Sequence, residues 1–582
     1  MFGFETIDVI TIGVYLLGVT LLGLRMGKTV HDSQDYFVGG RRFGKLLAIF
    51  NVFGAGTHSD QAVGVVSKTY TSGMSGIWYQ WLYLFVTPFN WWISPILRRC
   101  RAITTGDYFE ARYDRGVATL YVVFGIINMM VSIGLLLKGA GAVIRATAGG
   151  QVSEEWAIAA MTVMFVAYSI VGGLAAVIVT DFVQGCLTIL FSFILLPFAL
   201  VRLGGFTGLH EGVARAVGLM QEASPDGHVP GTDHMWSLVA PGEIGFFYIT
   251  MIVINGLVGL VVQPHAMPIS GAVKTEKEAQ IGSVYGTMMK RVCTVAWTLL
   301  GMCAIALYPG VIEKAEIDQM FGRLAHNLLP DVMPGLVGIF IASLLASIMS
   351  SCGSFTLACS GLLTHNIYRP FISPEASQTR FVAIGRATTV ITVVGGVFIA
   401  WELESVVRGI ELFWIISALM GIPFWAGLFW RKATSAGAWA STLAACAVWY
   451  LTERPWFTEW AAVHADWLLF GDKIYLPTQM LLYLTVGVIV MVVVSLLTAP
   501  PAHEKLDLFY ATLRTPIQPG ERVRESLRLP QGVEPAPQRK LFDHPDWEIQ
   551  IPTRRGIVGF LFAWLMVLAL IAAVWLLVRI GA

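Results

Sequence analysis

The stretch NVFGAGTHSDQAVGVV, residues 51–66, determines how this chain folds. It lies within an apolar segment long enough to cross a membrane, yet glycines and a polar run from Thr57 to Gln61 occupy its centre. Non-helical backbone is tolerated at membrane depth only where it lines a cavity, and its carbonyl oxygens can then coordinate a cation or a solute. The alternative is a glycine-rich packing surface whose polar groups bond to neighbouring helices. The density of polar residues favours a broken helix.

The composition of the whole chain predicts that most of it lies in lipid. Of 582 residues, 55% are hydrophobic, and the mean hydropathy is +0.67. Charged residues make up 13%, about half of their share in a soluble globular protein. The 39 basic residues nearly balance the 38 acidic ones, so no strongly basic face for nucleic acid is expected. The expected environment is the lipid bilayer.

Apolar segments of about 20 residues can cross roughly 30 Å of hydrocarbon, and the chain has about fourteen of them. Their predicted ranges are 7–24, 46–67, 76–97, 117–147, 155–175, 178–201, 244–266, 284–308, 333–364, 379–401, 406–430, 434–452, 479–498 and 557–580. The predicted fold class is therefore an all-α polytopic membrane protein.

Basic residues cluster in alternate loops, whereas the loops 203–243 and 309–332 contain few of them. The clusters include Arg41 with Arg42, the group Lys274, Lys277, Lys290 and Arg291, and the long stretch 499–556. Because basic loops stay in the cytoplasm, an even number of spans places both termini outside. The chain is expected in the plasma or inner membrane.

The stretch 499–556 is the one substantial soluble piece that the sequence predicts. Its segment KLDLFYATLRTP, residues 505–516, places Leu506, Phe509, Tyr510 and Leu513 on one helical face. We expect a cytoplasmic connector lying along the inner membrane surface. A regulatory or partner-binding role is the alternative.

Enzyme motifs are missing from the sequence, which contains neither H-E-x-x-H nor G-x-S-x-G. Polar residues inside a membrane are costly and usually functional, so the chain is expected to be a transporter and not an enzyme. A channel is disfavoured because no repeated filter sequence is visible. A transporter-like sensor usually has an appended signalling domain, and only Gly581 and Ala582 follow the last segment.

A second polar pattern occurs in IASLLASIMSSCGSFTLACS, residues 341–360. Residues with small side chains recur there at three- and four-residue spacing and so share one helical face: Ser343, Ala346, Ser347, Ser350 and Ser354. Taken alone, such a pattern is more often small-residue helix packing, with hydroxyls bonded back to the preceding turn. The adjacent hydroxyls of Ser350 and Ser351, if they face an unwound helix, would also suit Na+.

Four stretches together resemble the sodium:solute symporter family, which includes proline, pantothenate, acetate and sugar symporters. They are DYFVGGRRFG at 35–44, GGLAAVIVTDFVQG at 172–185, QPHAMPISGAVKTEKEAQ at 263–280 and SIMSSCGSFTLACSGLLTHNIY at 347–368. The resemblance implies a LeuT-like core of ten helices in two inverted five-helix repeats. The implied divisions are 1–45 (an extra helix and loop), 46–201 (first repeat), 202–243 (extracytoplasmic loop), 244–430 (second repeat), 431–498 (two accessory helices), 499–556 (connector) and 557–582 (last helix).

The resemblance also implies a site for Na+, the coupling ion. Carbonyl oxygens of the broken first core helix and a carbonyl plus two hydroxyls of the eighth form this site in the family. The matching residues here are Gly54, Thr57, Ser347, Ser350 and Ser351. The resemblance places Asp181 on the exit path of the ion, although the stretch TDFVQ also fits a helix cap or a salt bridge.

The substrate residues match no single branch of the family. Gln61 matches the sugar branch, but Gln80 stands where that branch has Glu. The run Gln263-Pro264-His265 resembles the proline, pantothenate and acetate branch, but Ile269 stands where that branch has Arg. The predicted substrate residues are Asp60, Gln61, Gln80, Gln263 and His265.

The predicted function is sodium-coupled symport of a small polar solute by alternating access, with an amino acid or organic acid favoured over a sugar. His58 and Asp60 can both titrate, so co-transport of H+ is an alternative. A hydrogen-bonded pair that fixes the unwound loop would explain the same two residues.

Overall fold

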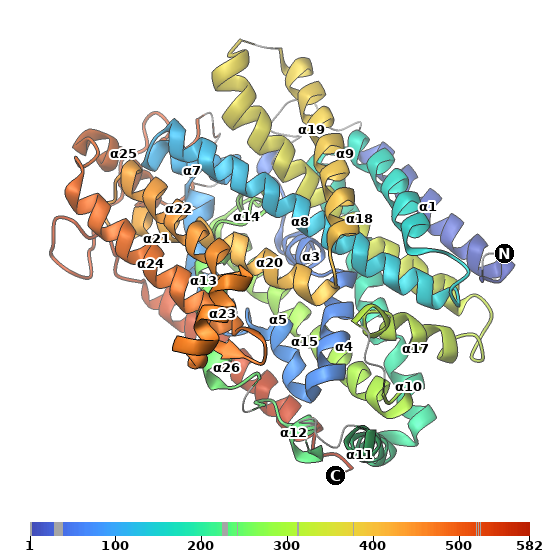
Figure 1. The fold of residues 1–582 in the computed structure, drawn as a ribbon. Coiled ribbons are helices and arrows are strands. Elements are labelled where there is room, and N and C mark those ends of the chain that lie inside the picture. The colour runs from blue at the N-terminus through green and yellow to red at the C-terminus, as the bar shows by residue number, and fades with distance from the viewer. Residues whose placement is uncertain are drawn as a thin grey trace.

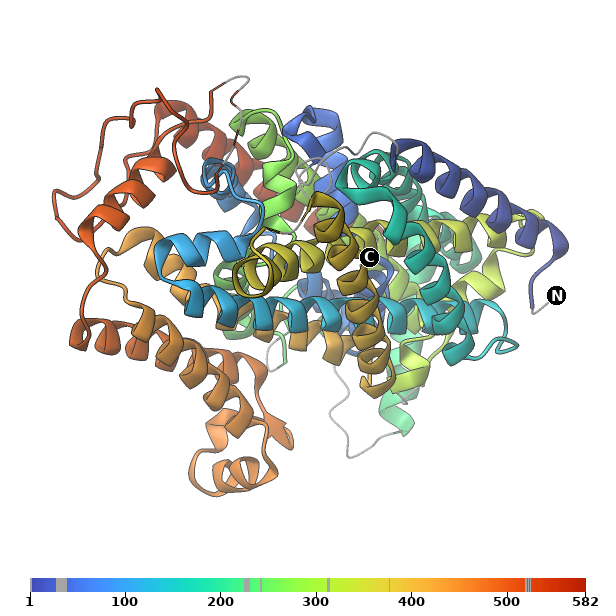
Figure 2. The same cartoon turned by 90° about the horizontal axis from the view of Figure 1, so that it is seen from above.

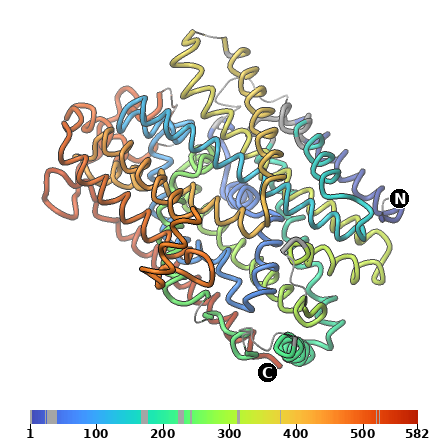
Figure 3. Tube along the Cα trace, in the orientation of Figure 1, coloured from blue at the N-terminus to red at the C-terminus, as the bar shows by residue number. Residues whose placement is uncertain are grey.

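The computed structural model describes residues 3–27, 39–223, 231–240, 243–310, 314–375, 377–518, 521, 523 and 525–581. Residues 35–38 of the first family-like stretch therefore lie outside the described part. Figure 1 shows a bundle of helices, and Figure 3 traces the same path as a tube.

The first half of the described chain is helical. Its elements are α1 (Thr6–Gly27), η1 (Gly39–Arg41), α3 (Lys45–Gly56), α4 (Ser59–Ser72), η2 (Gly73–Ile77), α5 (Trp78–Trp81), η3 (Thr87–Phe89), α6 (Asn90–Arg99), α7 (Thr105–Arg112), α8 (Arg115–Thr147), α9 (Glu154–Phe193), α10 (Leu195–Leu203), α11 (Gly205–Ala223) and α12 (Thr232–Trp236). Helices α9 and α10 together cover the segments predicted at 155–175 and 178–201.

The second half adds a short hairpin, in which β1 and β2 pair antiparallel with Leu469 opposite Ile474. Its elements are α13 (Phe246–Leu260), α14 (Ala266–Gly271), α15 (Glu276–Leu307), α16 (Lys314–Ile317), α17 (Met320–Leu328), α18 (Leu336–Gly361), the π-helical η4 (Leu362–Ile372), α19 (Gln378–Glu402), α20 (Val406–Leu419), α21 (Gly421–Phe429), α22 (Ser435–Thr452), α23 (Pro455–His464), η5 (Asp466–Leu468), β1 (Leu469–Phe470), β2 (Lys473–Ile474), α24 (Leu476–Leu497), α25 (His503–Arg514) and α26 (Arg554–Leu577).

In the described residues, eight helices are long and apolar enough to cross a membrane, and α3, α13 and part of α1 are shorter apolar helices. The fold class is thus confirmed as all-α and polytopic. The count of about fourteen spans stays a prediction, because helices that are interrupted at mid-length, such as α3–α4 and α13–α14, fall below the length that defines a span.

The arrangement in space puts α18 at the centre of the bundle. Helices α22, α24 and α25 gather on one side and α1 lies on the opposite side, as Figures 1 and 2 both show. The last helix runs back along the bundle, where Phe560 stacks on Trp92 with ring centroids 3.9 Å apart and the Val578 carbonyl lies 3.1 Å from His210 Nε2.

The amphipathic helix of the connector, α25, is expected from the sequence to lie along the membrane surface, and the structure corrects this expectation. Its apolar residues Leu506, Phe509, Tyr510 and Leu513 are buried against the protein, at 2–7% exposure. Tyr510 Oη donates to the Gly427 carbonyl at 2.8 Å, and Phe509 packs against Tyr108 with ring centroids 5.3 Å apart. Because α7 and α21 cover this face, it is not available to lie on a membrane surface.

Candidate functional site

The polar run at 57–61 does interrupt a helix, as the sequence predicts. Helix α3 ends at Gly56, α4 begins at Ser59, and the two residues between them have extended backbone. Thr57 has φ −127° and ψ 111°, and His58 has φ −146° and ψ 168°. The interruption frees carbonyl groups at the end of α3 and N–H groups at the start of α4 for other partners.

Helix α18 brings its serines against the end of α3. Ser351 Oγ lies 3.0 Å from the Gly54 carbonyl oxygen and 3.2 Å from the Ser347 carbonyl oxygen, and it can donate to either. A Cβ atom at Gly54 would lie 2.6 Å from Ser350 Oγ, so a side chain there would force the Ser350 hydroxyl to move. Four of the five predicted sodium ligands therefore meet in one place.

Asp181 of α9 completes this group of oxygens. Ser350 Oγ donates to Asp181 Oδ1 at 2.5 Å, so the carboxylate lies beside the predicted sodium ligands. The cap or salt bridge considered for Asp181 is not what the described residues show. Its second oxygen, Oδ2, is buried and has no hydrogen-bond partner among them, and the same is true of the Thr57 hydroxyl.

The donor set at this place suits a hard monovalent cation. All of its groups are oxygens, from backbone carbonyls, hydroxyls and one carboxylate, and such ligands are preferred by hard cations. Buried polar atoms without partners are costly, so the Asp181 Oδ2 and Thr57 Oγ1 atoms favour a ligand that supplies the missing contacts. The residues present therefore fit Na+.

The five predicted substrate residues line one cavity of about 150 Å³. Gln61 Nε2 lies 3.0 Å from His58 Nε2, and Gln263 Nε2 donates to Tyr83 Oη at 3.4 Å. His58 Nδ1 pairs with Asp60 Oδ1, so the alternative of a bonded pair that fixes the loop is seen. The residues that the structure brings together here are Asp60, Gln61, Gln80, Gln263 and His265.

Two charged residues of the cavity were placed wrongly by the sequence analysis. Lys290 and Arg291 were grouped with a basic loop, but they lie well inside α15 and are only 7% and 2% exposed. Arg291 donates to the Gln80 carbonyl and lies over the Tyr83 ring. The missed signal was their position inside the apolar segment predicted at 284–308, because intramembrane bases are usually functional.

A second hollow, of about 800 Å³, lies next to this cavity. Tyr79 lines the second hollow and Trp414 lines the cavity, and their ring centroids are 5.2 Å apart. Tyr79 Oη donates to Glu411 Oε1 at 2.8 Å, which holds the ring between the two spaces. The Tyr79–Trp414 ring pair thus lies between the cavity and the second hollow.

Known proteins resemble this chain in sequence. Residues 36–445 match the model of the sodium:solute symporter family. A sodium/proline symporter of Haemophilus influenzae is 26% identical over 545 residues, which cover 88% of this chain and 98% of the relative. A sodium/glucose cotransporter of Vibrio parahaemolyticus is 24% identical over 466 residues, which cover 75% and 83%.

The fold is shared with a solved structure of a Na+-coupled sialic acid symporter in a substrate-bound, outward-open state. The TM-score is 0.67, at 18% sequence identity, and the match covers 85% of this chain and 99% of that one. This likeness confirms the expected fold class.

Proposed function

The chain belongs to the sodium:solute symporter family, and from this premise we propose which groups bind the ion and the solute. It is a multi-pass membrane transporter and not an enzyme, with sodium as the coupling ion and a small solute as cargo. The proposal concerns the sites, the chemistry of the solute and the orientation in the membrane.

Sodium binds between α3 and α18. Its ligands are the carbonyl oxygens of Gly54, Thr57 and Ser347 and the hydroxyl oxygens of Ser350 and Ser351. The contact of Ser351 with Gly54 supports this assignment, because it aligns the two helices from which the ligands come. Asp181 attracts the ion as it leaves, since its carboxylate lies one hydrogen bond from Ser350.

Coupling follows from differential affinity. Sodium holds α3 against α18 and so stabilises one state of the transporter, and the start of α4 presents Asp60 and Gln61 to the solute in the same state. If both ligands favour the same state, each raises the affinity for the other by the same factor. The distribution of basic residues among the loops supports an orientation with the α7 and α25 end of the bundle in the cytoplasm and both termini outside.

The solute is a small organic acid. The observation that carries this proposal is Lys290, which lines the cavity and makes no ion pair within 4.0 Å among the described residues. Asp60, the acidic residue of the lining, already pairs with His58. Apart from the histidines and a tyrosine, the ionisable lining groups are Lys290, Arg291 and Asp60, so basic side chains outnumber acidic ones by two to one. A carboxylate supplies the counter-charge that a buried Lys290 needs to stay protonated, whereas a sugar has no such charge.

An amino acid is the second candidate. Its carboxylate would contact Lys290, and its ammonium group would contact Asp60, whose Oδ2 atom has no hydrogen-bond partner in the described part of the chain. A relative named as a sodium/proline symporter supports this candidate.

Uptake into proteoliposomes tests the proposal. Short monocarboxylates, neutral amino acids and hexoses are offered with and without a sodium gradient, to the wild type and to Lys290→Gln. We expect sodium-driven uptake of a monocarboxylate that Lys290→Gln loses. Uptake of hexoses alone, unchanged in Lys290→Gln, would contradict the assignment.

Proton coupling is tested in the same vesicles. Uptake is driven by a pH gradient without sodium, in the wild type and in Asp60→Asn. We expect no substantial uptake in the wild type, and weakened solute binding with retained sodium dependence in Asp60→Asn. Substantial pH-driven uptake would favour coupling through the His58–Asp60 pair.

A further inference from the structure

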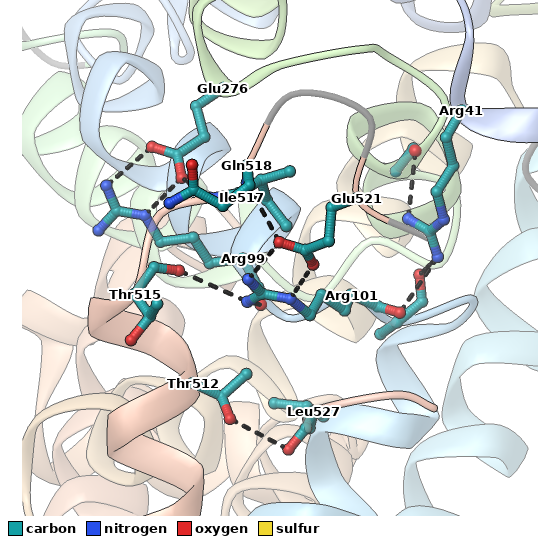
Figure 4. Close-up of polar contacts among 12 residues, drawn as sticks. Arg41, Arg99, Arg101, Glu276, Thr512, Thr515, Ile517, Gln518, Glu521 and Leu527 are labelled. Atoms are coloured by element: carbon teal, nitrogen blue, oxygen red, sulfur yellow. Dashed lines mark hydrogen bonds and ion pairs between the residues drawn. The ribbon is translucent and has the colours of Figure 1, made fainter. Parts of the chain in front are cut away.

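The connector after α25 binds both halves of the core at one end of the bundle. Figure 4 shows these contacts. Ile517 N donates to Glu276 Oε1 at 3.0 Å, and Glu276 is the first residue of α15 in the second predicted repeat. Glu521 accepts two hydrogen bonds from Arg101, at 2.5 and 3.0 Å, and Arg101 follows α6 in the first predicted repeat.

The ion pair of Arg101 with Glu521 is removed from solvent. The Arg101 side chain is 0% exposed and the Glu521 side chain 4%. Arg101 also donates to the Arg99 carbonyl at 3.0 Å, so the guanidinium is held from two sides. Breaking a buried, bidentate pair by removing one partner is far more costly than breaking a solvated pair. Breaking the Arg101–Glu521 pair is therefore expected to be costly.

Two further contacts fix the connector just after Glu521. Leu527 N donates to the Cys100 carbonyl at 2.8 Å, and Ser526 Oγ donates to Asp107 Oδ2 of α7 at 2.9 Å. Thr512 of α25 donates to the Leu527 carbonyl at 3.3 Å, which ties the returning segment to its own helix.

Backbone strain is concentrated at the same contact. Among the described residues, the non-glycine residues with positive φ are Arg41 (55°), Arg101 (56°) and Leu527 (53°). All three meet here, because Arg41 donates to the Arg101 carbonyl at 3.1 Å and Leu527 binds the residue before Arg101. Left-handed backbone is unfavourable in such residues and persists only where the surroundings enforce it, often at switch regions.

The contact lies just beyond one end of the solute cavity. Helix α6 lines the cavity with Asn90, Ile93, Ser94 and Leu97 and then reaches Arg99. Helix α15 begins at Glu276 and lines the cavity from Ser283 onward. Arg99 and Glu276 pair directly through two hydrogen bonds of 2.8 Å, so the two cavity-lining helices are joined at this end.

We propose that the connector residues Ile517, Glu521, Ser526 and Leu527 form a latch that keeps the solute pathway closed at this end, with the Arg101–Glu521 ion pair as its lock. The proposal rests on the alternating access proposed above, since the two repeats must separate here to open the cavity. The strained residues return to ordinary backbone when the latch releases, which lowers the free-energy difference between closed and open states. The connector is then a part of the gate and not only a link to α26.

Thiol labelling of a cavity position tests the latch. Ser94→Cys is introduced, because Ser94 lines the cavity and is 2% exposed. The purified protein in detergent is treated with a polar maleimide, and labelling at position 94 is resolved by mass spectrometry. Sodium and solute are left out, so the result does not depend on which solute is transported.

Glu521→Gln is compared with Glu525→Gln in this background. Glu525 pairs with Arg528 in solvent, at 62% and 63% exposure, so this variant loses the same charge from the same connector. We expect labelling at least about tenfold faster in Glu521→Gln, as a population shift toward the open state requires, and unchanged in Glu525→Gln. Equal labelling rates in the two folded variants would overturn the proposal.

A cooperative melting transition shows that each variant is folded. If Glu521→Gln shows no cooperative melting transition, the variant Arg101→Lys is used in its place. This variant keeps the positive charge but cannot form the bidentate pair with Glu521. Its labelling should then also be faster than in Glu525→Gln, and an equal rate counts against the latch. Faster labelling in a protein without sodium-driven uptake would support the latch and refute the proposed function, so the two outcomes are distinguishable.

Discussion

The sodium site and the solute cavity share one broken helix but are built from different groups. On the α3 side of the break, Gly54 meets the hydroxyl of Ser351, and the groups around it are carbonyls, hydroxyls and the carboxylate of Asp181. On the α4 side, Asp60 and Gln61 meet a cavity that also contains Lys290 and Arg291. The proposed function uses this difference, because it assigns a cation to the oxygen-lined site and an anionic solute to the cavity with the two basic side chains.

The largest effect is expected from the hydroxyls of the sodium site. Ser350→Ala and Ser351→Ala should each abolish sodium-driven uptake while the protein remains folded and inserted, because each removes a ligand that the backbone cannot replace. Uptake under a sodium gradient measures this.

Ser343→Ala is the matched control, since Ser343 lies on the same buried face of α18 without a contact to Gly54. Normal sodium dependence in the variant that combines Ser350→Ala and Ser351→Ala would show that these hydroxyls do not bind sodium. The proposed difference between the two sites would then be wrong.

The next effect concerns the positive charge of the cavity. Lys290→Gln should raise the half-saturation concentration of the carboxylate by a hundredfold or more, because losing one partner of a buried pair costs about 3–5 kcal/mol. Kinetics at saturating sodium measure it. Lys277→Gln, an exposed position of the same helix, should behave as the wild type. A similar loss in both variants would mean that Lys290 does not contact the solute.

A smaller effect is expected at Asp318, which contacts α4 away from both sites. Asp318 accepts hydrogen bonds from Ser67 Oγ and Val406 N, both at 2.8 Å, and burial raises its pKa to about 6. Its proton is bound more tightly in the folded state, so the stabilisation is complete below the unfolded pKa of about 3.8 and is lost as the pH rises through 6. The free energy of unfolding is expected to fall by about 2–3 kcal/mol over this pH range.

Thermal melting between pH 4 and pH 7 measures this loss against Asp318→Asn, which lacks the titrating group. The wild type should lose stability relative to the variant across this interval. Parallel curves would show that Asp318 does not titrate there.

The smallest effect is expected from a neutral amide of the cavity. Gln61→Ala should raise the solute half-saturation concentration severalfold at saturating sodium, since one hydrogen bond contributes about 1 kcal/mol. Sodium half-saturation without solute should stay unchanged. Unaltered solute affinity in Gln61→Ala and Gln263→Ala together would place the solute elsewhere.

Local sequence by itself determined the membrane class, the broken helix and the serine-lined face of α18. Glycines and adjacent polar residues at mid-membrane leave few alternatives to an unwound stretch, and helical spacing places Ser343, Ser347, Ser350 and Ser354 on one face. The resemblance to the family predicted the sodium ligands and the substrate residues. These features can be predicted from the sequence because each depends on residues only a few positions apart.

Tertiary structure alone decided which distant groups meet. Asp181 reaches Ser350 across 169 positions, and Arg101 reaches Glu521 across 420. The apolar face of α25 showed the right pattern, but its partner proved to be α7 and α21 instead of lipid. Lys290 and Arg291 are basic, as residues of a cytoplasmic loop often are. They line the cavity instead, because α15 extends past them into the core. Helical periodicity fixes which side of a helix is apolar or charged, whereas the packing of the whole chain decides what that side touches.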